Sequence, residues 1–246
     1  MNDETNKFSW LQHFRFLITP EHPCSYLDDQ VATTLFVDPL ENMDVEKYSQ
    51  LAERGFRRSG DHVYRPHCAL CSECKLVRIR VDDFEPGRSH KRIMRKNASV
   101  DMRWVHADFS DEHFSLYRRY MRHRHPGSSM DNDDPLHYTH IMQADWCSTR
   151  LAEFRLDQRL VAVAITDWLE NGLSAVYTFF DPRLAAQSLG TFAILSQIAA
   201  AREARLDYVY LGYWIQACQK MSYKIRFNAL EIFNGHRWYQ NLDDLS

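Results

Sequence analysis

Apolar and polar residues alternate with a regular period through the second half of the chain. Residues 151–156 and 159–169 have the pattern of strands separated by a two-residue turn, and a second turn at 170–172 leads into the apolar run LSAVYTFFDP. A helical pattern with a cap near Ser188 comes next, followed by the apolar and aromatic stretch DYVYLGYWI. The pattern predicts three antiparallel strands, a helix and one more buried strand, in that order.

Residues 1–105 show shorter periods and more turns. In GFRRSGDHVYRPH, strand-like pieces flank a Ser-Gly-Asp turn, and CKLVRIRVDDF alternates like a strand. After Ser110, which can cap a helix, Phe114 and Tyr117 fall on one helical face. We therefore expect an α+β protein with two parts: a smaller β-rich region with cysteines over residues 1–105, and a second domain over residues 106–246.

The composition is that of an ordinary globular protein of 246 residues, with 45% hydrophobic and 26% charged residues. The polar start MNDETNKFSW does not resemble a signal peptide, and the longest apolar run, residues 160–165, is far too short to span a membrane. We therefore expect a cytoplasmic protein with no membrane partner. In that compartment the six cysteines should stay reduced, and metal binding or packing explains them better than disulfides.

Seven motifs resemble those of one enzyme family and occur in the same order. They are HPCSYL, GFRRSG, YRPHC, RHRHPG, YTFFDP, SLGTFAILSQIAAAREARLDYVYLGYWI and CQKMSYKIRF. Over roughly residues 8–240 the chain thereby resembles the bacterial leucyl-tRNA–protein transferases, or aspartate/glutamate leucyltransferases, which are related to arginyl-tRNA–protein transferases. The resemblance implies a GNAT-like acyltransferase domain, whose core has the strand and helix order predicted above, but which uses no acetyl-CoA.

The resemblance also implies the reaction. Leucine passes from the ester of leucyl-tRNA to the α-amine of a protein that begins with Asp or Glu, and the product enters N-end rule degradation. The implied partners are therefore leucyl-tRNA and proteins with N-terminal Asp or Glu, and the transfer requires no cofactor. Because the ester is already activated, positioning and stabilisation of the oxyanion can supply most of the catalysis.

The groups expected around the reacting ester lie at the ends of two predicted core strands. Tyr213 and Lys220 belong to YLGYWIQACQK, and Tyr177 and Asp181 belong to YTFFDP. Lys224, a few residues further on, is expected to bind a phosphate or a carboxylate. The alternatives are tyrosines packed in the core, solvated lysines and an aspartate that only forms a turn.

Two features could bind the ribose and phosphates of tRNA. Ser188 and Gly190 lie at a predicted helix N-terminus that can face ribose or phosphate, whereas Phe192 would crowd the pyrophosphate of coenzyme A. Residues 54–96 hold twelve Lys/Arg against five Asp/Glu, although the net charge of the chain is −3. The residues expected to contact tRNA phosphates are Arg88, Lys91, Arg92, Arg95 and Lys96. A plain N-cap and a solvated charged face are the alternatives.

The acidic acceptor requires a cation that reads its side-chain carboxylate. Arginine does this best because its planar fork holds a carboxylate by two parallel hydrogen bonds. Arg78 and Arg80 share one face of a predicted strand, and an anion between them would offset their repulsion. We therefore predict that Arg78 reads the acceptor, with Arg80 and Arg65 in reserve. The alternative is a surface ladder paired with Asp82 and Asp83.

The cysteines of HPCSYL and YRPHCALCSECK form a candidate metal site. Cys68, Cys71 and Cys74 follow at three-residue spacing, and Cys24 could complete a tetrahedral set of thiolates, with His67 in reserve. We expect zinc or an iron–sulfur cluster here, and zinc after aerobic purification. In the related arginyl transferases, cysteines of two such segments are thought to form a regulatory site of this kind. Reduced thiols that pack as small apolar residues are the alternative.

Two other functions fit part of the pattern. A GNAT-type N-acetyltransferase would use the same fold with acetyl-CoA as the donor, and an acetyl-CoA titration would distinguish it. A non-catalytic, zinc-containing RNA-binding protein would need only the cysteines and the basic segment. The concentration of tyrosines and lysines at the end of a buried strand favours an enzyme over the second alternative.

Overall fold

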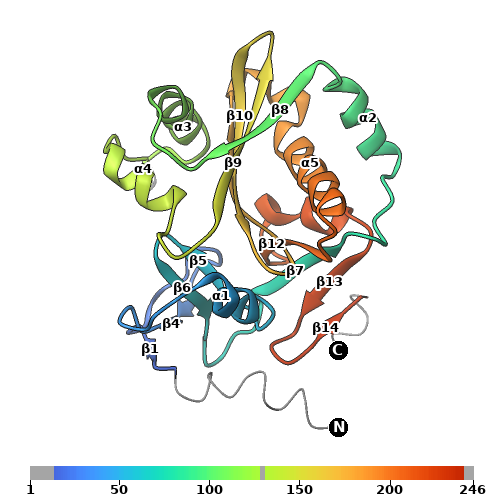
Figure 1. Ribbon diagram of the computed structural model, residues 1–246. Helices are drawn as coiled ribbons and strands as arrows, with labels where there is room; N and C mark the ends of the chain where they lie inside the picture. Colours follow the sequence, from blue (N-terminus) through green and yellow to red (C-terminus); the bar gives the residue numbers. More distant parts are fainter. Residues whose placement is uncertain (1–13, 128–130, 241–246) are drawn as a thin grey trace.

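The computed structural model describes residues 14–127 and 131–240, and its largest feature is an eight-stranded mixed sheet (Figure 1). Across the sheet the strands are β14 (Trp238–Tyr239), β13 (Leu230–Phe233), β7 (Lys75–Arg80), β12 (Tyr208–Trp214), β11 (Gly172–Phe180), β10 (Arg159–Trp168), β9 (Thr149–Leu156) and β8 (Val100–His106). All neighbours are antiparallel except β11 and β12, which are parallel. The chain therefore combines helices with a large mixed sheet.

Helices cover both faces of this sheet. The helical segments are α2 (Arg88–Lys96), α3 (Asp111–Arg124), α4 (Pro135–Met142), η2 (Pro182–Gln187) and α5 (Leu189–Glu203). On one face α5 packs against β10, β11 and β12, and α2 packs against α5; on the other face lie α3 and α4 (Figure 1). Buried Ile198 belongs to the core beneath α5, and buried Tyr117 and Tyr138 belong to the core beneath α3 and α4.

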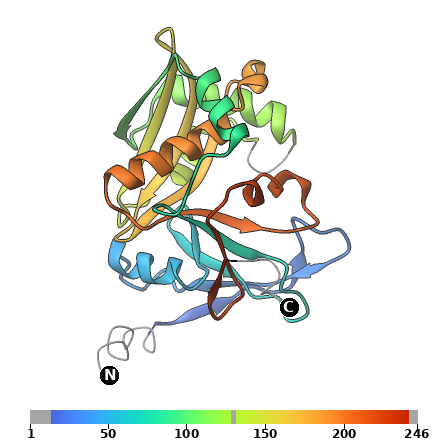
Figure 2. The same cartoon turned by 90° about the vertical axis from the view of Figure 1, so that its right-hand side faces the viewer.

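A second layer lies below the large sheet and contains most of the N-terminal third (Figure 2). Its elements are a four-stranded sheet of β1 (Phe16–Ile18), β4 (Thr34–Val37), β6 (His62–Pro66) and β5 (Arg57–Ser59), a small ladder of β2 (His22–Pro23) and β3 (Val31–Ala32), and α1 (Val45–Ala52). Tyr48 and Leu51 of α1 share a buried cluster with Leu76 and Tyr210 of the large sheet. The two layers are therefore joined by a common core.

The predicted order of three antiparallel strands, a helix and another strand is confirmed by β9, β10, β11, α5 and β12. The predicted hairpin at Ser59-Gly60-Asp61 is also confirmed, as is the helix after Ser110, whose hydroxyl accepts a hydrogen bond from the backbone N–H of His113. The division at residue 105 stays a prediction. β7 lies before it and β8 crosses it, and both pair within the large sheet with strands from after it.

Candidate functional site

The parallel strands β11 and β12 pair only over Gly172–Ser174 and Tyr208–Tyr210. Beyond this point β11 continues along β10 and β12 continues along β7, and Figure 2 shows β12 running away from the rising strands β9 to β11. The pairing of β12 with β7 shifts register between Tyr210 and Gly212. Such irregularities are common beside active sites, because they redirect side chains and end pairing. The place where the two strands part is therefore the candidate site.

Arg57 of β5 bridges the two strands where they part. Its guanidinium donates to the carbonyl of Ala175 (2.7 Å), the hydroxyl of Ser174 (3.0 Å) and the carbonyl of Tyr210 (3.5 Å). It also lies over Gly212, where an added Cβ would come within 3.5 Å of the guanidinium carbon. Gly212 has φ of +80°, which an L side chain rarely adopts, so the backbone conformation beside Arg57 favours glycine.

Lys224 lies beside Arg57 at the start of the short helix η4 (Lys224–Arg226). It is buried, and its ammonium donates to the backbone carbonyl of Tyr213. Burial and the positive charge of Arg57 lower the pKa of Lys224 to about 7, which the nearby Cys218 opposes only in part. Lys224 is therefore a cation whose charge can change near neutral pH.

Aromatic and basic groups surround these two cations. Burial and the proximity of Tyr120 raise the pKa of Tyr177, and they raise the pKa of Tyr223 to about 12. The rings of Tyr120 and Tyr177 meet edge to face, with centroids 6.3 Å apart. His125, whose ring centroid is 6.4 Å from that of Tyr120, has its pKa lowered by burial and by the charge of Lys220. The predicted residues Tyr177, Lys220 and Lys224 thus belong to one neighbourhood.

Sequence reasoning placed Tyr223 near the end of a core strand but did not single out three other members of this neighbourhood: Arg57, Tyr120 and His125. Two of these, Arg57 and His125, nevertheless stand in motifs that carry the family resemblance, namely GFRRSG and RHRHPG. The motifs were a usable signal for these residues. Without the tertiary structure, however, they did not show which residue of each motif faces the place where β11 and β12 part.

Tyr213 contributes its backbone to this neighbourhood and directs its phenol elsewhere. The hydroxyl donates to the carbonyl of Gly55 (2.8 Å) beneath the sheet, and burial raises its pKa well above the usual value. The carbonyl of Tyr213, by contrast, accepts the hydrogen bond from Lys224. A direct catalytic role of Tyr213 stays a prediction.

Asp181 follows β11 and organises the turn into η2. It accepts hydrogen bonds from the backbone and guanidinium of Arg183, and it also pairs with Arg159. Hydrogen bonds from Arg183 lower the pKa of Asp181 to about 2, so the carboxylate is a weak base in this setting. These contacts are those of a turn-forming residue, and its role as a catalytic base stays a prediction.

Arg78 of β7 lies in an aromatic cage formed by residues of β12 and β14, within the large sheet. Its Nε donates to Glu231 (2.7 Å), and its guanidinium carbon is 3.5 Å from the ring centroid of Tyr208 and 4.0 Å from that of Trp238. A cavity of about 320 Å³ is lined in part by Arg78, Tyr208 and Trp238. The anion beside Arg78 and Arg80 is therefore the chain's own Glu231. Whether Arg78 reads the acceptor stays a prediction.

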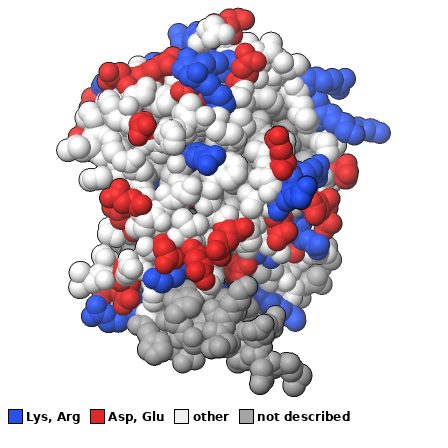
Figure 3. Space-filling view, in the orientation of Figure 1, with Lys and Arg blue, Asp and Glu red and all other residues white. Residues whose placement is uncertain are grey.

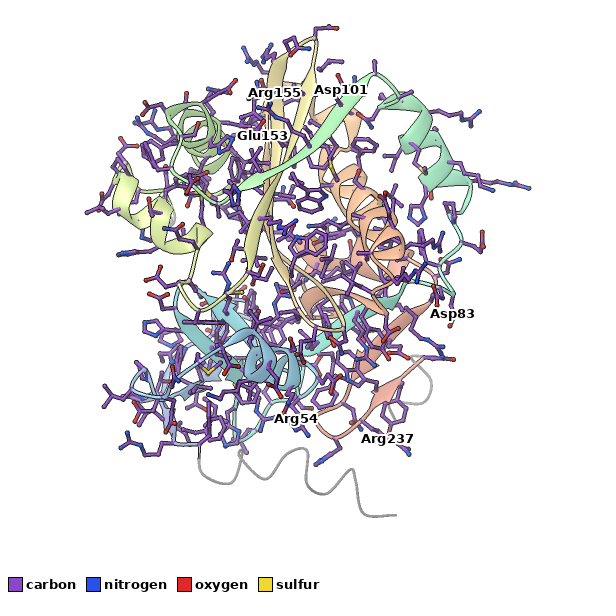
Figure 4. The ribbon with its side chains drawn as sticks, viewed as in Figure 1. Arg54, Asp83, Asp101, Glu153, Arg155 and Arg237 are labelled. Atoms are coloured by element: carbon purple, nitrogen blue, oxygen red, sulfur yellow. The ribbon has the colours of Figure 1, made fainter. Side chains whose placement is uncertain are left out.

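The two reserve arginines also have partners within the chain. Arg80 pairs with Asp83 (3.0 Å), whose position near the end of β7 is labelled in Figure 4. Arg65 stacks over Phe56, with its guanidinium carbon 5.0 Å from the ring centroid, and donates to the carbonyl of Arg54 (3.3 Å). Both arginines are therefore already held by groups of the protein itself.

The basic residues 88–96 form the helix α2, and a helix is the structure that the prediction of one basic face requires. All five of its predicted tRNA-contacting residues are exposed, and Figure 3 shows basic side chains at the upper right, where α2 lies. At the start of α5, Ser188 adopts φ of +56° and its side chain does not cap the helix. Gly190 faces the ring of Phe180, which an added Cβ would approach to 3.6 Å.

The four cysteines of the candidate metal site lie close together. Burial and the neighbouring thiols of Cys24, Cys68 and Cys71 raise the pKa of Cys74 to about 12. The thiol of Cys68 is 3.7 Å from the carbonyl of Thr33. In residues 14–127 and 131–240, however, no group of three or more His, Cys, Asp or Glu side chains is arranged to hold a metal ion. The thiols are gathered but are not placed as a ligand set.

A different polar cluster lies at the other end of the large sheet, where Figure 4 labels Glu153 and Arg155 of β9. Burial opposes ionisation of Glu153, but hydrogen bonds from Arg155, Arg103 and His113 lower its pKa to about 2. All three contacts are short, between 2.6 and 3.0 Å. This cluster is a satisfied structural network that joins β8, β9 and α3, and it stands apart from the candidate site.

Comparisons with known proteins bear on the whole chain. Residues 22–92 match the family described as arginine-tRNA-protein transferase, N terminus, and residues 112–234 match its C-terminal counterpart. The chain is 48% identical over 228 residues to an aspartate/glutamate leucyltransferase of Pseudomonas savastanoi pv. phaseolicola, and the match covers 93% of this chain and 97% of the relative. A protein of the same description from Alcanivorax borkumensis is also 48% identical, over 93% of this chain and 94% of the relative.

Solved structures offer a weaker likeness. The C-terminal domain of a protein described as a putative lysylphosphatidylglycerol synthetase from Agrobacterium fabrum superposes with a TM-score of 0.45 and 17% identity, over 68% of this chain and 50% of that chain. A TM-score below 0.5 is too low to define a shared fold. Within the described residues, none of the helices has the length and apolar character needed to cross a membrane.

Proposed function

This chain belongs to the arginine-tRNA-protein transferase family, and we propose that it is a leucyltransferase acting on proteins whose first residue is Asp or Glu. The observation that carries this proposal is the 48% identity to aspartate/glutamate leucyltransferases over nearly the full length of both chains. The donor is leucyl-tRNA, and the product is a protein extended by one leucine. We further propose a cytoplasmic location and a place in N-end rule degradation, since leucyl-tRNA is a reactant.

The reaction is an acyl transfer from an ester to an amine. The α-amine of the acceptor attacks the carbonyl carbon of the leucyl ester, a C–N bond forms, the C–O bond to the terminal ribose breaks, and one proton passes from nitrogen to the ribose oxygen. The α-amine has a reference pKa of about 8, so a small shift in protonation makes it nucleophilic. The protein's task is therefore to hold two substrates together and to exclude water.

We propose that the reacting ester lies where β11 and β12 part, in a GNAT-like arrangement. The order β9, β10, β11, α5, β12 and the separation of the parallel pair support this, because the separation exposes backbone groups between adjacent strands. The proposed catalytic residues are Tyr177, Lys220, Tyr213 and Asp181. The proposed contacts to the terminal ribose and phosphates are Ser188 and Gly190 with the exposed basic face of α2.

A metal centre on Cys24, Cys68, Cys71 and Cys74 remains a narrower proposal. Its support is the mutual proximity of the four thiols, and the absence of a ligand arrangement among the described residues stands against it. Elemental analysis of anaerobically and aerobically purified protein tests it. About one zinc per chain, or iron with sulfide, lost on Cys71→Ser with Cys74→Ser, would support the centre, whereas metal-free and fully active protein would exclude it.

Transfer of labelled leucine tests the proposed function. We expect label to pass from leucyl-tRNA to model proteins that begin with Asp or Glu, and not to matched proteins that begin with Arg or Ala. The same protein should show no acetyl transfer from acetyl-CoA. Acetylation without leucine transfer would favour the acetyltransferase alternative, and tRNA binding without any transfer would favour the RNA-binding alternative.

A further inference from the structure

Two of the buried cations in the described part of the chain have no carboxylate as an ion-pair partner. Arg57 is 7% exposed and Lys224 is 6% exposed, and neither forms an ion pair with any residue in 14–127 or 131–240. The other two buried arginines of that part of the chain are both matched: Arg58 pairs with Asp167 (2.6 Å), and Arg78 pairs with Glu231 (2.7 Å). Among the described residues, the buried lysine and arginine charges without an ion-pair partner are therefore confined to the place where β11 and β12 part.

Such an arrangement is costly in the free protein. A buried charge is tolerated when it is paired and hydrogen-bonded, and two neighbouring like charges add repulsion to the loss of hydration. The carbonyls of Ala175 and Tyr210 orient the guanidinium of Arg57, and that of Tyr213 orients the ammonium of Lys224, but carbonyls are neutral. An anion that binds between the two cations would remove most of this cost.

Both cations keep donors for such an anion. An ammonium has three N–H donors and a guanidinium has five. Lys224 uses one of its donors on the carbonyl of Tyr213. The hydrogen bonds of Arg57 within the described residues involve its two terminal nitrogens, so its Nε remains available to a ligand. A planar guanidinium and an adjacent ammonium suit a carboxylate, which can accept from both at once.

We propose that Arg57 and Lys224 together bind the side-chain carboxylate of the acceptor's first residue, and so select Asp and Glu. This inference rests on the proposed function. Its position is appropriate, since the first residue's α-amine must reach an ester held where the strands part. It also gives these two residues the role that the sequence suggested for Arg78, whose charge Glu231 already balances.

A phosphate of the tRNA is the other anion that could bind here. The enclosed setting of Arg57 and Lys224 favours the smaller carboxylate, which a protein N-terminus can insert on a single side chain. Phosphates along a tRNA backbone are served by exposed cations, and α2 supplies a row of these on the surface. If the anion is the acceptor's carboxylate, binding of the acceptor depends on Lys224. If it is a tRNA phosphate, binding of leucyl-tRNA depends on Lys224.

The test compares acceptor peptides that begin with Asp or with its neutral isostere Asn. In Lys224→Gln we expect kcat/KM for the Asp peptide to fall by at least about tenfold, and kcat/KM for the Asn peptide to change by no more than about twofold. Affinity for leucyl-tRNA should stay unchanged. Arg57→Lys, which keeps the charge but loses the fork, should also lower the Asp-to-Asn ratio. Arg226→Gln, which removes an exposed cation of the same short helix, should leave the ratio unchanged.

Each contrary outcome is distinct. Equal losses with the Asp and Asn peptides would mean that Lys224 only supports the fold, and would overturn the inference. Weaker leucyl-tRNA binding with an unchanged acceptor KM would assign the pair to a phosphate, and would also overturn it. Variants that lose activity with neither peptide would likewise overturn this inference, and leucine transfer to Asp peptides by the wild-type protein would still leave the proposed function standing. Wild-type protein that transfers leucine to no acceptor would overturn both.

Discussion

At the scale of single residues, the protonation state of Lys224 is the property most closely tied to acceptor selection. Its ammonium is buried beside Arg57, so the protein holds its pKa at about 7, far below the usual value of a lysine. The groups that face it are the guanidinium of Arg57 from β5, the thiol of Cys218, the carbonyl of Tyr213 and the ring of Tyr223, whose centroid is 5.9 Å from the ammonium. A bound carboxylate would favour the charged form, so acceptor binding and protonation of Lys224 should be coupled.

This coupling predicts a pH dependence. Above a pH of about 7 free Lys224 loses the proton that would pair with the acceptor's carboxylate, so the KM for an Asp peptide should rise from about pH 7 to about pH 9. The KM for an Asn peptide should not rise in this way. Measuring the Asp-to-Asn ratio of kcat/KM removes the shared titration of the α-amine. A ratio that is flat or increases over this range would show that the ammonium form of Lys224 does not contribute to selection.

The roles of individual residues were what the sequence predicted least well. Arg57 and Arg58 are adjacent and chemically identical, yet Arg58 meets Asp167 while Arg57 meets only neutral carbonyls and a hydroxyl. Likewise the strand pattern of Arg78 suggested either an acceptor carboxylate or Asp82 and Asp83 as its partner, but Glu231, which is 153 residues away in sequence, pairs with it. Such matches depend on tertiary neighbours, which period and composition do not encode.

At the scale of elements, Gly212 and the register shift beside it lie on β12 just beyond the residues that pair with β11. Sequence period predicted β9, β10, β11, α5 and β12 well, because long buried elements repeat a clear pattern. It did not predict α1 or α4, each of eight residues, since so short a helix presents only about two turns of pattern. The sequence period also could not show where β11 and β12 separate, because the pairing of strands far apart in sequence is determined by the tertiary fold.

Gly212→Ala should weaken both the fold and the selection of acceptors. A side chain at positive φ costs about 1–2 kcal/mol, and the backbone shift that relieves this strain would occur beside the guanidinium of Arg57, which the new Cβ would contact at 3.5 Å. Gly235→Ala is the matched control, since Gly235 also has positive φ but an added Cβ meets nothing within 4 Å. Urea unfolding should show similar losses of stability in both variants, while the Asp-to-Asn ratio should fall only in Gly212→Ala. Equal ratios in the two variants would argue against Arg57 as a selector.

The helix α2 makes its own prediction. Replacing Arg92 and Arg95 with alanine should weaken leucyl-tRNA binding and reduce the slope of log affinity against log salt by roughly one unit for each phosphate that is no longer neutralised. Arg119→Ala, which removes an arginine from α3 at the other face of the sheet, should change neither quantity. If the double variant binds leucyl-tRNA with wild-type affinity and salt slope, the basic face of α2 is only solvated.

At the scale of the whole molecule, the two layers are held together around a fully buried ion pair. Arg58 of β5 donates from Nε and a terminal nitrogen to Asp167 of β10 (2.7 and 2.6 Å), and also to the carbonyl of Met142 and the hydroxyl of Thr149. This network fixes β5, and hence the neighbouring Arg57, against the large sheet. The change in composition near residue 105 suggested two parts, but it did not indicate the ion pair that connects the two layers.

Loss of the ion pair between Arg58 and Asp167 should lower the free energy of unfolding strongly. Asp167→Asn would leave the charge of Arg58 buried without a partner, and we expect a loss of about 3–5 kcal/mol in the free energy of unfolding, measured in urea. Asp133→Asn is the control, because Asp133 pairs with Arg118 and Arg122 on the surface, where solvent screens the charges. Similar effects in the two variants would show that the buried pair does not hold the layers together.

The most direct test of the proposed site is a structure of the protein with a stable amide analogue of leucyl-adenosine and a peptide that begins with Asp. We predict that the leucyl carbonyl lies where β11 and β12 part, and that the Asp carboxylate lies within hydrogen-bonding distance of both Arg57 and Lys224. A carboxylate bound instead in the cavity beside Arg78, or an analogue bound away from the parting of β11 and β12, would contradict this prediction.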